Sequence, residues 1–354
     1  MSEVNLRIGT VNYTGWKTAS ISRSIESLCG SFSLELIDGF TPELWPITPN
    51  VEADIDIDNT PVMRGLIDRI SPSIKQDSRG LSVSGRDTTA DLVDCSAMNE
   101  PGTWRNNTVT VTTLARALCA PFDVRVIAER QTAEKFTHTI QAGESPFESL
   151  ARANEFEGAL FLTDERGRLL ITSPGQGEPA TDKLVTGENI IEASAAIDYS
   201  DRFSDYTVKG QAREIGDGWN SNTVSVKASS SDPIIASKRF RPKLIVAEKT
   251  VNTADAQNRA DLEATVRAAK SSQVTVTVAG WAQRSGRLWP LNGLVSVNIP
   301  ELQLTDRKML ITSVNYSKSI GEGSRTIIEL RREDAYKALV KKQVRTGTAN
   351  GYGW

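Results

Sequence analysis

The chain has 354 residues, of which 39% are hydrophobic and 24% are charged, and its formal net charge is −3. This length predicts two or more domains, and the composition is ordinary for a soluble globular protein. The small net charge gives no electrostatic reason to expect a nucleic-acid partner. The N-terminus has no charged-then-apolar leader, and no apolar run approaches the ~20 residues of a membrane span, so we expect a chain made in a reducing cytoplasm without a membrane anchor.

Residues 1–90 predict a series of short strands. Apolar residues alternate along Val4–Val11, Phe32–Leu36, Met63–Ile70 and Leu81–Val83, and prolines separate these segments. Short strands at this spacing are typical of a small antiparallel barrel or sandwich.

Helical spacing then begins, over Thr89–Cys95 and Val111–Leu118. A third helix is predicted to start at Ser145, which suits an N-cap, with Glu148 completing a capping box, and to run to about Phe156. These helices indicate a compact α+β domain between residues ~96 and 180.

Two short apolar runs, residues 159–162 and 169–172, flank a turn and predict a hairpin at the end of this domain. The segment Ser173–Asp182 follows it and contains Pro-Gly-Gln-Gly-Glu-Pro. Its composition predicts an interdomain linker.

The last third of the chain mixes strands with one long helix. The predicted strands are Ile190–Ile197, Tyr206–Gln211, Val274–Val278, Val295–Ile299, Met309–Tyr316 and Thr326–Leu330. The Ala-, Arg- and Glu-rich segment Ala254–Ala269 predicts a helix. A short helix is expected at Asp334–Val344, and the Gly-rich tail Arg345–Trp354 is expected to be loose until it meets a partner.

Two separated segments present the same order of features. The stretch Trp281–Pro300 has an aromatic–proline step, Trp289–Pro290, followed by Asn292 and an alternating strand. An earlier segment begins in the same way, with Trp45–Pro46, Asn50 and the alternating strand Val51–Ile57. In both segments a further strand follows, Met63–Ile70 in the first and Met309–Val314 in the second, and then a Ser-Arg pair, Ser78–Arg79 and Ser324–Arg325. Both chance reuse of turn chemistry and a true duplication fit this pattern. If the duplication is real, residues ~216–284 are inserted within the second copy, whose barrel includes both Tyr206–Gln211 and Val295–Ile299.

The residues that chemistry would need are sparse. His138, the one histidine, lies in an alternating strand without a recognisable nucleophile motif, which favours a packing role. The carboxylates of Asp54, Asp56 and Asp58 share one strand face, but they lack the Gly and Glu of a calcium loop, so a solvated face is expected. We therefore predict no catalytic, cofactor or metal site.

Other candidate motifs are equally weak. The cysteines form no Cys-x-x-Cys pair and are expected to be buried free thiols; they are Cys29, Cys95 and Cys119. Gly216–Gly218 and Gly321–Gly323 lack the pattern of a phosphate loop, and Lys238–Arg241 is a short basic patch. Residues 141–158 weakly resemble the start of a LysM peptidoglycan-binding module, although the capping box explains the same residues without a ligand.

The order of these motifs resembles that of the baseplate hub proteins of contractile-tailed phages, of the phage Mu tail protein P type, and more distantly the late-control D proteins of P2-like phages. The resemblance covers nearly the whole chain and is most distinctive in Gly85–Ser96 and Trp281–Pro300. Its other segments are Trp16–Arg23 with Phe32–Leu36, Gly143–Leu150, and Met309–Tyr316.

This resemblance implies a mainly β fold with two similar tail-tube-like antiparallel β-barrels and two smaller α+β domains. The expected divisions are 1–95 (first barrel), 96–183 (α+β domain), 184–215 with 285–335 (second barrel), 216–284 (inserted α+β domain) and 336–354 (helix and flexible tail). It further implies a non-enzymatic homotrimer in the virion tail baseplate, assembled in the host cytoplasm. Two barrels per chain would give a pseudo-sixfold ring between the sixfold tail tube, or a tube-initiator protein, and the trimeric central spike.

In that arrangement the hub would contact other baseplate proteins, and phage DNA would pass through its lumen without sequence-specific binding. Two rival interpretations remain at this point: a wall-binding or wall-degrading tail protein, and a component of a secretion-system spike. The lone His138 argues against the enzyme, and the absence of a spike-like β-helix after Trp354 argues against the secretion component.

Overall fold

The protein is mainly β, with several sheets. The computed structural model describes residues 3–37, 47–76, 78–98, 105–130, 132, 135–154, 157–214, 222–247 and 252–332. The described residues form two compact units: those within 1–153, 159–194 and 275–330 form unit 1, and those within 154–158, 195–274 and 331–354 form unit 2.

A 13-stranded sheet dominates unit 1, in the order β14-β18-β21-β20-β3-β4-β7-β6-β5-β1-β2, with β19 beside β20 and β13 beside β19. Period-two burial, such as that of Ile55 and Ile57, gives these strands one apolar face. In the N-terminal part the strands are β1 (Val4–Ile8), β2 (Val11–Tyr13), β3 (Thr18–Ser24), β4 (Ser31–Ile37), β5 (Glu52–Ile57), β6 (Thr60–Ile74) and β7 (Arg79–Asp87). In the C-terminal part they are β13 (Leu184–Val185), β14 (Ile190–Ile197), β18 (Ser272–Ala279), β19 (Leu294–Ile299), β20 (Leu304–Ser319) and β21 (Gly323–Arg332).

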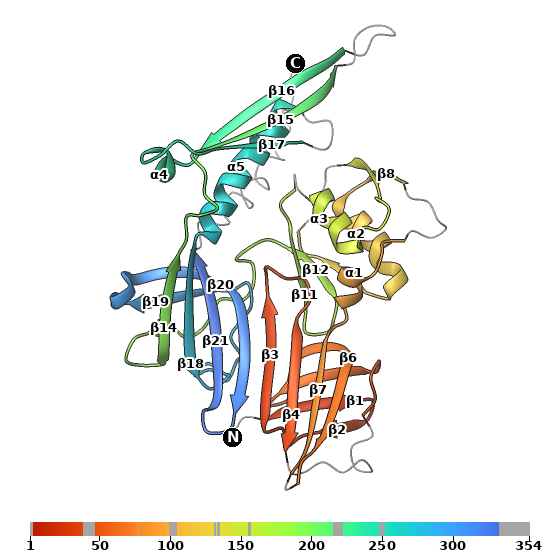
Figure 1. The fold of residues 1–354 in the computed structure, drawn as a ribbon, viewed down its shortest axis with the longest axis vertical. Coiled ribbons are helices and arrows are strands. Elements are labelled where there is room, and N and C mark those ends of the chain that lie inside the picture. The colour runs from red at the N-terminus through yellow and green to blue at the C-terminus, as the bar shows by residue number, and fades with distance from the viewer. Residues whose placement is uncertain are drawn as a thin grey trace, which may run out of the picture. The chain divides into compact units, whose positions relative to one another are not determined.

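Two strands that are far apart in the sequence, β3 and β20, are neighbours in this sheet. Strand β20 pairs antiparallel with β3, from Ser313 opposite Ser24 to Lys318 opposite Ala19, and the two strands run side by side in Figure 1. We call this pairing the β3–β20 junction. It makes one continuous sheet of strands that were expected to form two separate barrels.

Strands on the two sides of the junction follow the same order. The first strand group runs β3-β4-β7-β6-β5, and the second strand group runs β14-β18-β21-β20-β19. Each group therefore places its five strands in the sequence order 1-2-5-4-3. The shared order agrees with the repeat seen in the sequence, while closure of either group into a barrel stays a prediction.

The corner that precedes the third strand is also built alike in both groups. Asn50 and Asn292 have left-handed φ angles of 61° and 60°. The Asn50 N–H donates to Ile67 O at 2.8 Å, and the Asn292 N–H donates to Ile311 O at 3.0 Å. Asparagine tolerates this conformation better than most residues. Of the residues that define the sequence repeat, Trp45 and Pro46 lie outside the described residues.

The remaining part of unit 1 is a small α+β region with its own apolar core, which contains Leu114, Leu118, Leu150 and Ile171. Its helices are α1 (Ala90–Asp94), α2 (Val111–Cys119), the 3-10 turn η1 (Ala120–Phe122) and α3 (Pro146–Asn154). Its sheets pair β8 (Arg105–Val109) with β10 (Phe136–Thr139), and β9 (Val126–Ala128) with the hairpin β11 (Leu160–Thr163) and β12 (Leu169–Thr172). The expected helices over residues 111–118 and from 145 onward, and the hairpin, are confirmed.

Unit 2 is a three-stranded sheet covered by one helix, as Figure 1 shows. The strands are β15 (Asp205–Glu214), β16 (Asn222–Ser231) and β17 (Pro242–Val246), and the helices are α4 (Pro233–Ala236) and α5 (Thr253–Lys270). Ala256 and Ala260 of α5 pack on Val208 and Val226. The predicted helix Ala254–Ala269 is thus confirmed as α5.

Two sequence expectations differ from the structure. Tyr206–Gln211, expected in the second barrel, belongs to β15 and pairs with β16 and β17 instead. Alternation identifies a strand but not its partner, which explains this error. Residues 173–182 connect the α+β region to the second strand group, as a linker would, but they are hydrogen-bonded along their length to residues 283–294. The helix expected at 334–344 and the tail lie outside the described residues.

Candidate functional site

His138 is the first candidate for chemistry, and the structure gives it a serine neighbour. Its Nε2 lies 2.7 Å from Ser149 Oγ on α3 and 3.5 Å from Arg152 Nη2. A serine beside a histidine is half of the arrangement used in nucleophilic catalysis. Ser149, however, is fully buried, so its hydroxyl has no path to a substrate in this conformation. The pair fastens α3 to β10, in keeping with the packing role expected for His138.

The predicted capping box at the start of α3 is present. Ser145 Oγ accepts the Glu148 N–H at 3.1 Å, and Glu148 Oε2 accepts the Ser145 N–H at 2.8 Å. Arg152 pairs with Glu144 at 2.7 Å. Although burial opposes it, hydrogen bonds from Arg152 hold the pKa of Glu144 below its usual value. These local contacts account for residues 141–152 without a ligand, and peptidoglycan binding stays a hypothesis.

The acidic strand face is a paired surface. Arg7 Nη2 lies 3.1 Å from Asp54 Oδ2 and 3.8 Å from Asp56 Oδ2, because β1 pairs with β5. Asp58 Oδ1 accepts the Glu3 N–H at 2.8 Å. Burial raises the pKa of Asp56 even though Arg7 opposes the shift. Asp54 and Asp56 are half-buried against an arginine and thus less solvated than expected, and they do not converge on a cation position.

The three cysteines differ in burial, and Arg241 of the basic patch contacts the backbone. Within the described ranges, no three His, Cys, Asp or Glu side chains gather as metal ligands. Cys119 is buried, which raises the pKa of its thiol to about 12; Cys29 is half-buried and Cys95 is exposed, which differs from the expected burial of all three. In the basic patch, Arg241 donates to the backbone oxygens of Tyr199 and Ser200.

One of the two glycine pairs lies within the described residues, in a turn between strands. Gly321 and Gly323 both have left-handed φ angles and form the turn between β20 and β21. Gly216–Gly218 lies outside the described residues. No helix in the described part of the chain is both long and apolar enough to cross a membrane.

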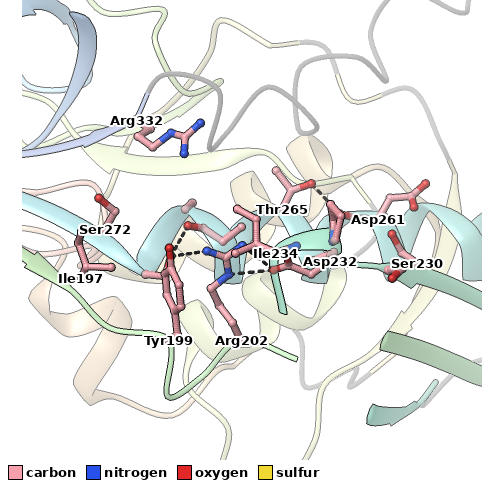
Figure 2. A pocket seen from close by; sticks show the side chains of 16 residues that line it. Ile197, Tyr199, Arg202, Ser230, Asp232, Ile234, Asp261, Thr265, Ser272 and Arg332 are labelled. Carbon is pink, nitrogen blue, oxygen red and sulfur yellow. Dashed lines mark hydrogen bonds and ion pairs between the residues drawn. The ribbon is translucent and has the colours of Figure 1, made fainter. Parts of the chain in front are cut away.

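A cavity of about 580 Å³ opens in unit 2 beside α4 and α5 (Figure 2). Arg202 reaches across its wall and donates to both carboxylate oxygens of Asp232, at 2.8 and 2.9 Å. The guanidinium also lies 4.5 Å from the centre of the Tyr199 ring. Asp232 in turn caps α4. Because Arg202 and Asp232 satisfy each other, we interpret this pair as a buried brace and not as a ligand-binding group.

The corner at Asn292 shows why the stretch Trp281–Pro300 stands out in the sequence. The Asn292 side chain is buried, donates to Ser173 O at 3.0 Å and accepts the Gly175 N–H at 2.8 Å. Gln283 Oε1 accepts the Thr181 N–H at 2.7 Å. Trp289 is buried, and its carbonyl accepts the Tyr316 hydroxyl at 2.8 Å. The stretch is therefore a fixed corner that also holds the connecting segment 173–182.

A second buried joint, at the end of β7, has no signal in the residue spacing. Asp87 is buried and accepts the Gly30 N–H at 2.6 Å, and the N–H and hydroxyl of Thr89 at 2.9 and 2.6 Å. The Thr89 hydroxyl lies 2.7 Å from that of Thr163, which donates to Leu28 O. Burial raises the pKa of Asp87. The Gly85–Ser96 motif thus connects the large sheet to the α+β region.

Comparison with known proteins gives a consistent result along the chain. Family models match residues 3–87 (Mu phage baseplate assembly protein GpP-like, N-terminal), 89–173 (baseplate hub protein gp44-like, second domain) and 252–338 (Mu phage baseplate assembly protein GpP, fourth domain). The chain is 33% identical to the baseplate hub protein gp44 of Escherichia phage Mu, over 98% of this chain and 93% of that protein.

Two solved structures are similar over almost their full length. One is the 43 kDa tail protein of prophage MuSo2 from Shewanella oneidensis, with a TM-score of 0.82, 32% identity, and coverage of 94% of this chain and 99% of that chain. The other is a tail protein from Neisseria meningitidis MC58, with a TM-score of 0.81, 24% identity, and coverage of 95% and 98%. At 24% identity, the similarity to the Neisseria meningitidis protein indicates a shared fold only.

Proposed function

The chain belongs to the family of Mu-type phage baseplate hub proteins and is a structural component of the virion tail baseplate, and from this premise we propose that three copies form a closed ring. The ring would join the sixfold tail tube, or its initiator, to the trimeric central spike. It would also line part of the conduit through which phage DNA leaves the virion.

The observation that carries this proposal is the repeated strand order. Each chain contains two strand groups of the same order, so a trimer offers six similar strand groups around one axis. The six strand groups of such a ring match the symmetry of a sixfold tube, and its three chains match the symmetry of a threefold spike. A trimer of chains with one strand group each would match only the spike.

The proposed role needs no catalytic group. The charged side chains described above are engaged with each other: Arg7 with two aspartates, Arg152 with Glu144, and Arg202 with Asp232. We propose that the protein is not an enzyme. Clearing of peptidoglycan in a zymogram by the purified chain would overturn this part of the proposal and favour a wall-degrading tail protein.

Light scattering coupled to size-exclusion chromatography tests the ring. We expect a mass three times the 38.6 kDa of one chain, either for the protein alone or after addition of the spike protein. Electron microscopy of the trimer should show six similar densities around a central opening. A strict monomer that binds neither tube nor spike protein would contradict the proposed function.

A further inference from the structure

We propose that neighbouring copies in the ring are joined by antiparallel pairing of β14 of one copy with β6 of the next, in the register of the β3–β20 junction within each chain. This inference rests on the proposed trimer and adds the strands, residues and register of its interface. The partner is a second copy of this chain.

The template is the internal junction. Strand β20 is long enough for two partners on one edge: its first part, up to Leu310, pairs with β19, and residues 313–318 pair with β3. Ala19, Ile21, Val314 and Tyr316 are buried on one face of this pairing. The junction therefore removes two strand edges from solvent and buries apolar side chains.

Strand β6 has the same design but lacks the second partner. It pairs with β5 over residues 60–66, and on the other edge with β7 over residues 65–74. Within the described residues, no strand pairs with the β5-side edge of β6 beyond Ile67. Ile67 occupies the place of Ile311, since each accepts the N–H of the corner asparagine. Residues 69–74 of β6 thus correspond to residues 313–318 of β20.

Strand β14 is the counterpart of β3, because each is the first strand of its group. It ends the sheet, so among the described strands β18 is its one partner. The Asp198 N–H donates to Ser271 O at 2.8 Å, and counting back along both strands from this pair places Ser194 opposite Thr275. Ser20 is likewise opposite Ser33. We align Thr275 with Ser33, since each lies between two buried residues, Val274 and Val276 in β18 and Phe32 and Leu34 in β4. In this alignment Ser194 corresponds to Ser20.

These correspondences fix the register between copies. Ser20 is opposite Ser317 within the chain, so Ser194 of one copy should be opposite Ser73 of the next. All four positions are serine. In this register one face pairs apolar residues, with Ile70 opposite Ile197, Pro72 opposite Ala195, and Ile74 opposite Ala193.

The other face of the same register pairs opposite charges. Arg69 falls opposite Asp198, and Lys75 falls opposite Glu192. Directly opposed charges of opposite sign stabilise neighbouring antiparallel strands, and a shift of one residue would lose both pairs and move the apolar residues to the wrong face. The register was derived without reference to these charges, so the charge pattern is independent support for the pairing.

Exposure on the two strands also indicates a missing partner. Ile74 is 80% exposed and Ile191 and Ile197 are 50% and 70% exposed, whereas Val314 and Ile21 at the internal junction are almost fully buried. Pro72 lacks an N–H, so the junction between copies would have one backbone hydrogen bond fewer than its template. A proline on an open edge also limits pairing with unrelated strands.

Paired cysteines test the register in the full chain. In a Cys95→Ser background, Ser73→Cys with Ser194→Cys should form disulfides between copies and give a covalent trimer on a non-reducing gel. The equivalent internal pair, Ser20→Cys with Ser317→Cys, is the matched control and should cross-link within one chain. Moving one partner by two residues, with Ser71→Cys in place of Ser73→Cys, should lower the yield at least about tenfold, because the Cα atoms then lie too far apart.

The outcomes separate this inference from the proposed function. A trimer by mass whose Ser73 and Ser194 variants do not cross-link, or cross-link no better than the shifted pair, overturns the β6–β14 interface and leaves the hub role standing. A strict monomer contradicts both. Charge reversal is a second test: Glu192→Lys alone should shift the trimer toward monomer, and Glu192→Lys with Lys75→Glu should restore it. Equal trimer populations in all three proteins would overturn the register.

Discussion

The two strand groups share one strand order, yet they are stabilised differently. In the second group, the corner residue Asn292 is buried and held by the segment 173–182, whereas in the first group Asn50 is exposed. The first group is instead tied to the α+β region through buried Asp87. A strand order can thus be kept twice in one chain while the contacts that brace each copy differ.

The two groups also differ in how side chains pack at their centre. A substitution there has the largest predicted effect on the free energy of unfolding. Gly85 of β7 lies opposite Phe32, and an added Cβ would meet the Phe32 ring at 2.7 Å and the backbone oxygen of Leu66 still more closely. We expect Gly85→Ala to lower the free energy of unfolding by about 3 kcal/mol, because backbone has no room to move away. Urea denaturation measures this, with Ser84→Ala as the control.

Val274 aligns with Phe32 and is smaller. Counting along both strands from the hydrogen bond between the Gly280 N–H and Ser324 O places Leu330 opposite Val274, as Gly85 lies opposite Phe32. The larger side chain of the facing pair therefore lies on the second strand in the first group and on the fifth strand in the second group. If Gly85→Ala unfolds within about 0.5 kcal/mol of the wild type, as surface substitutions do, this account of the packing difference is wrong.

The two corner asparagines should respond unequally to the same substitution. Asn292→Ala places alanine at a left-handed φ and leaves Ser173 O and the Gly175 N–H without their partner, so we expect a loss of about 2–3 kcal/mol. Asn50→Ala has only the conformational cost, about 1 kcal/mol. Thermal or urea unfolding of both variants measures the difference.

Glycine variants separate the two causes. Asn50→Gly should restore wild-type stability, whereas Asn292→Gly should restore only the conformational part. Equal losses for Asn50→Ala and Asn292→Ala would show that the segment 173–182 does not brace the second corner.

A smaller, pH-dependent difference is expected from Asp87, since the second group has Arg332 at the end of its corresponding strand. Burial raises the pKa of Asp87 in the folded state, so its favourable contribution is present at low pH and is lost as the pH rises through the folded pKa. Relative to Asp87→Asn, the wild type should lose stability from pH 4 to pH 7. A stability difference that grows with pH would contradict the sign.

The smallest effect concerns the outer edge of the first group, where β1 pairs with β5 through Arg7. Arg7→Ala should lower stability by about 0.5 kcal/mol at pH 7, as for other half-exposed ion pairs, and by less at pH 3, where the pKa of Asp56, already raised by burial, leaves it protonated. Lys308→Ala on β20 is the control. A loss that is equal at both pH values would exclude the ion pair as its cause.

Local patterns in the sequence predict local structure well here. The capping box at Ser145 and Glu148, helix α5, and the alternating strands follow from residue spacing alone. Strand partners do not: alternation in Tyr206–Gln211 identifies a strand equally well for either sheet. The Asp87 joint was also out of reach, because Thr163 is 76 positions beyond Asp87 and carries no sequence signal.

The β3–β20 junction has a consequence for how the chain is made. Ser20 and Asn315, which contact each other across it, are separated by 295 residues. At about 5–20 residues per second, the edge of β3 waits roughly 15–60 seconds for its partner to leave the ribosome. Long-range pairing of this kind slows folding and leaves a strand edge exposed to other nascent chains. A chain that terminates early would never cover that edge, so incomplete hubs should aggregate or be degraded before they enter a growing tail.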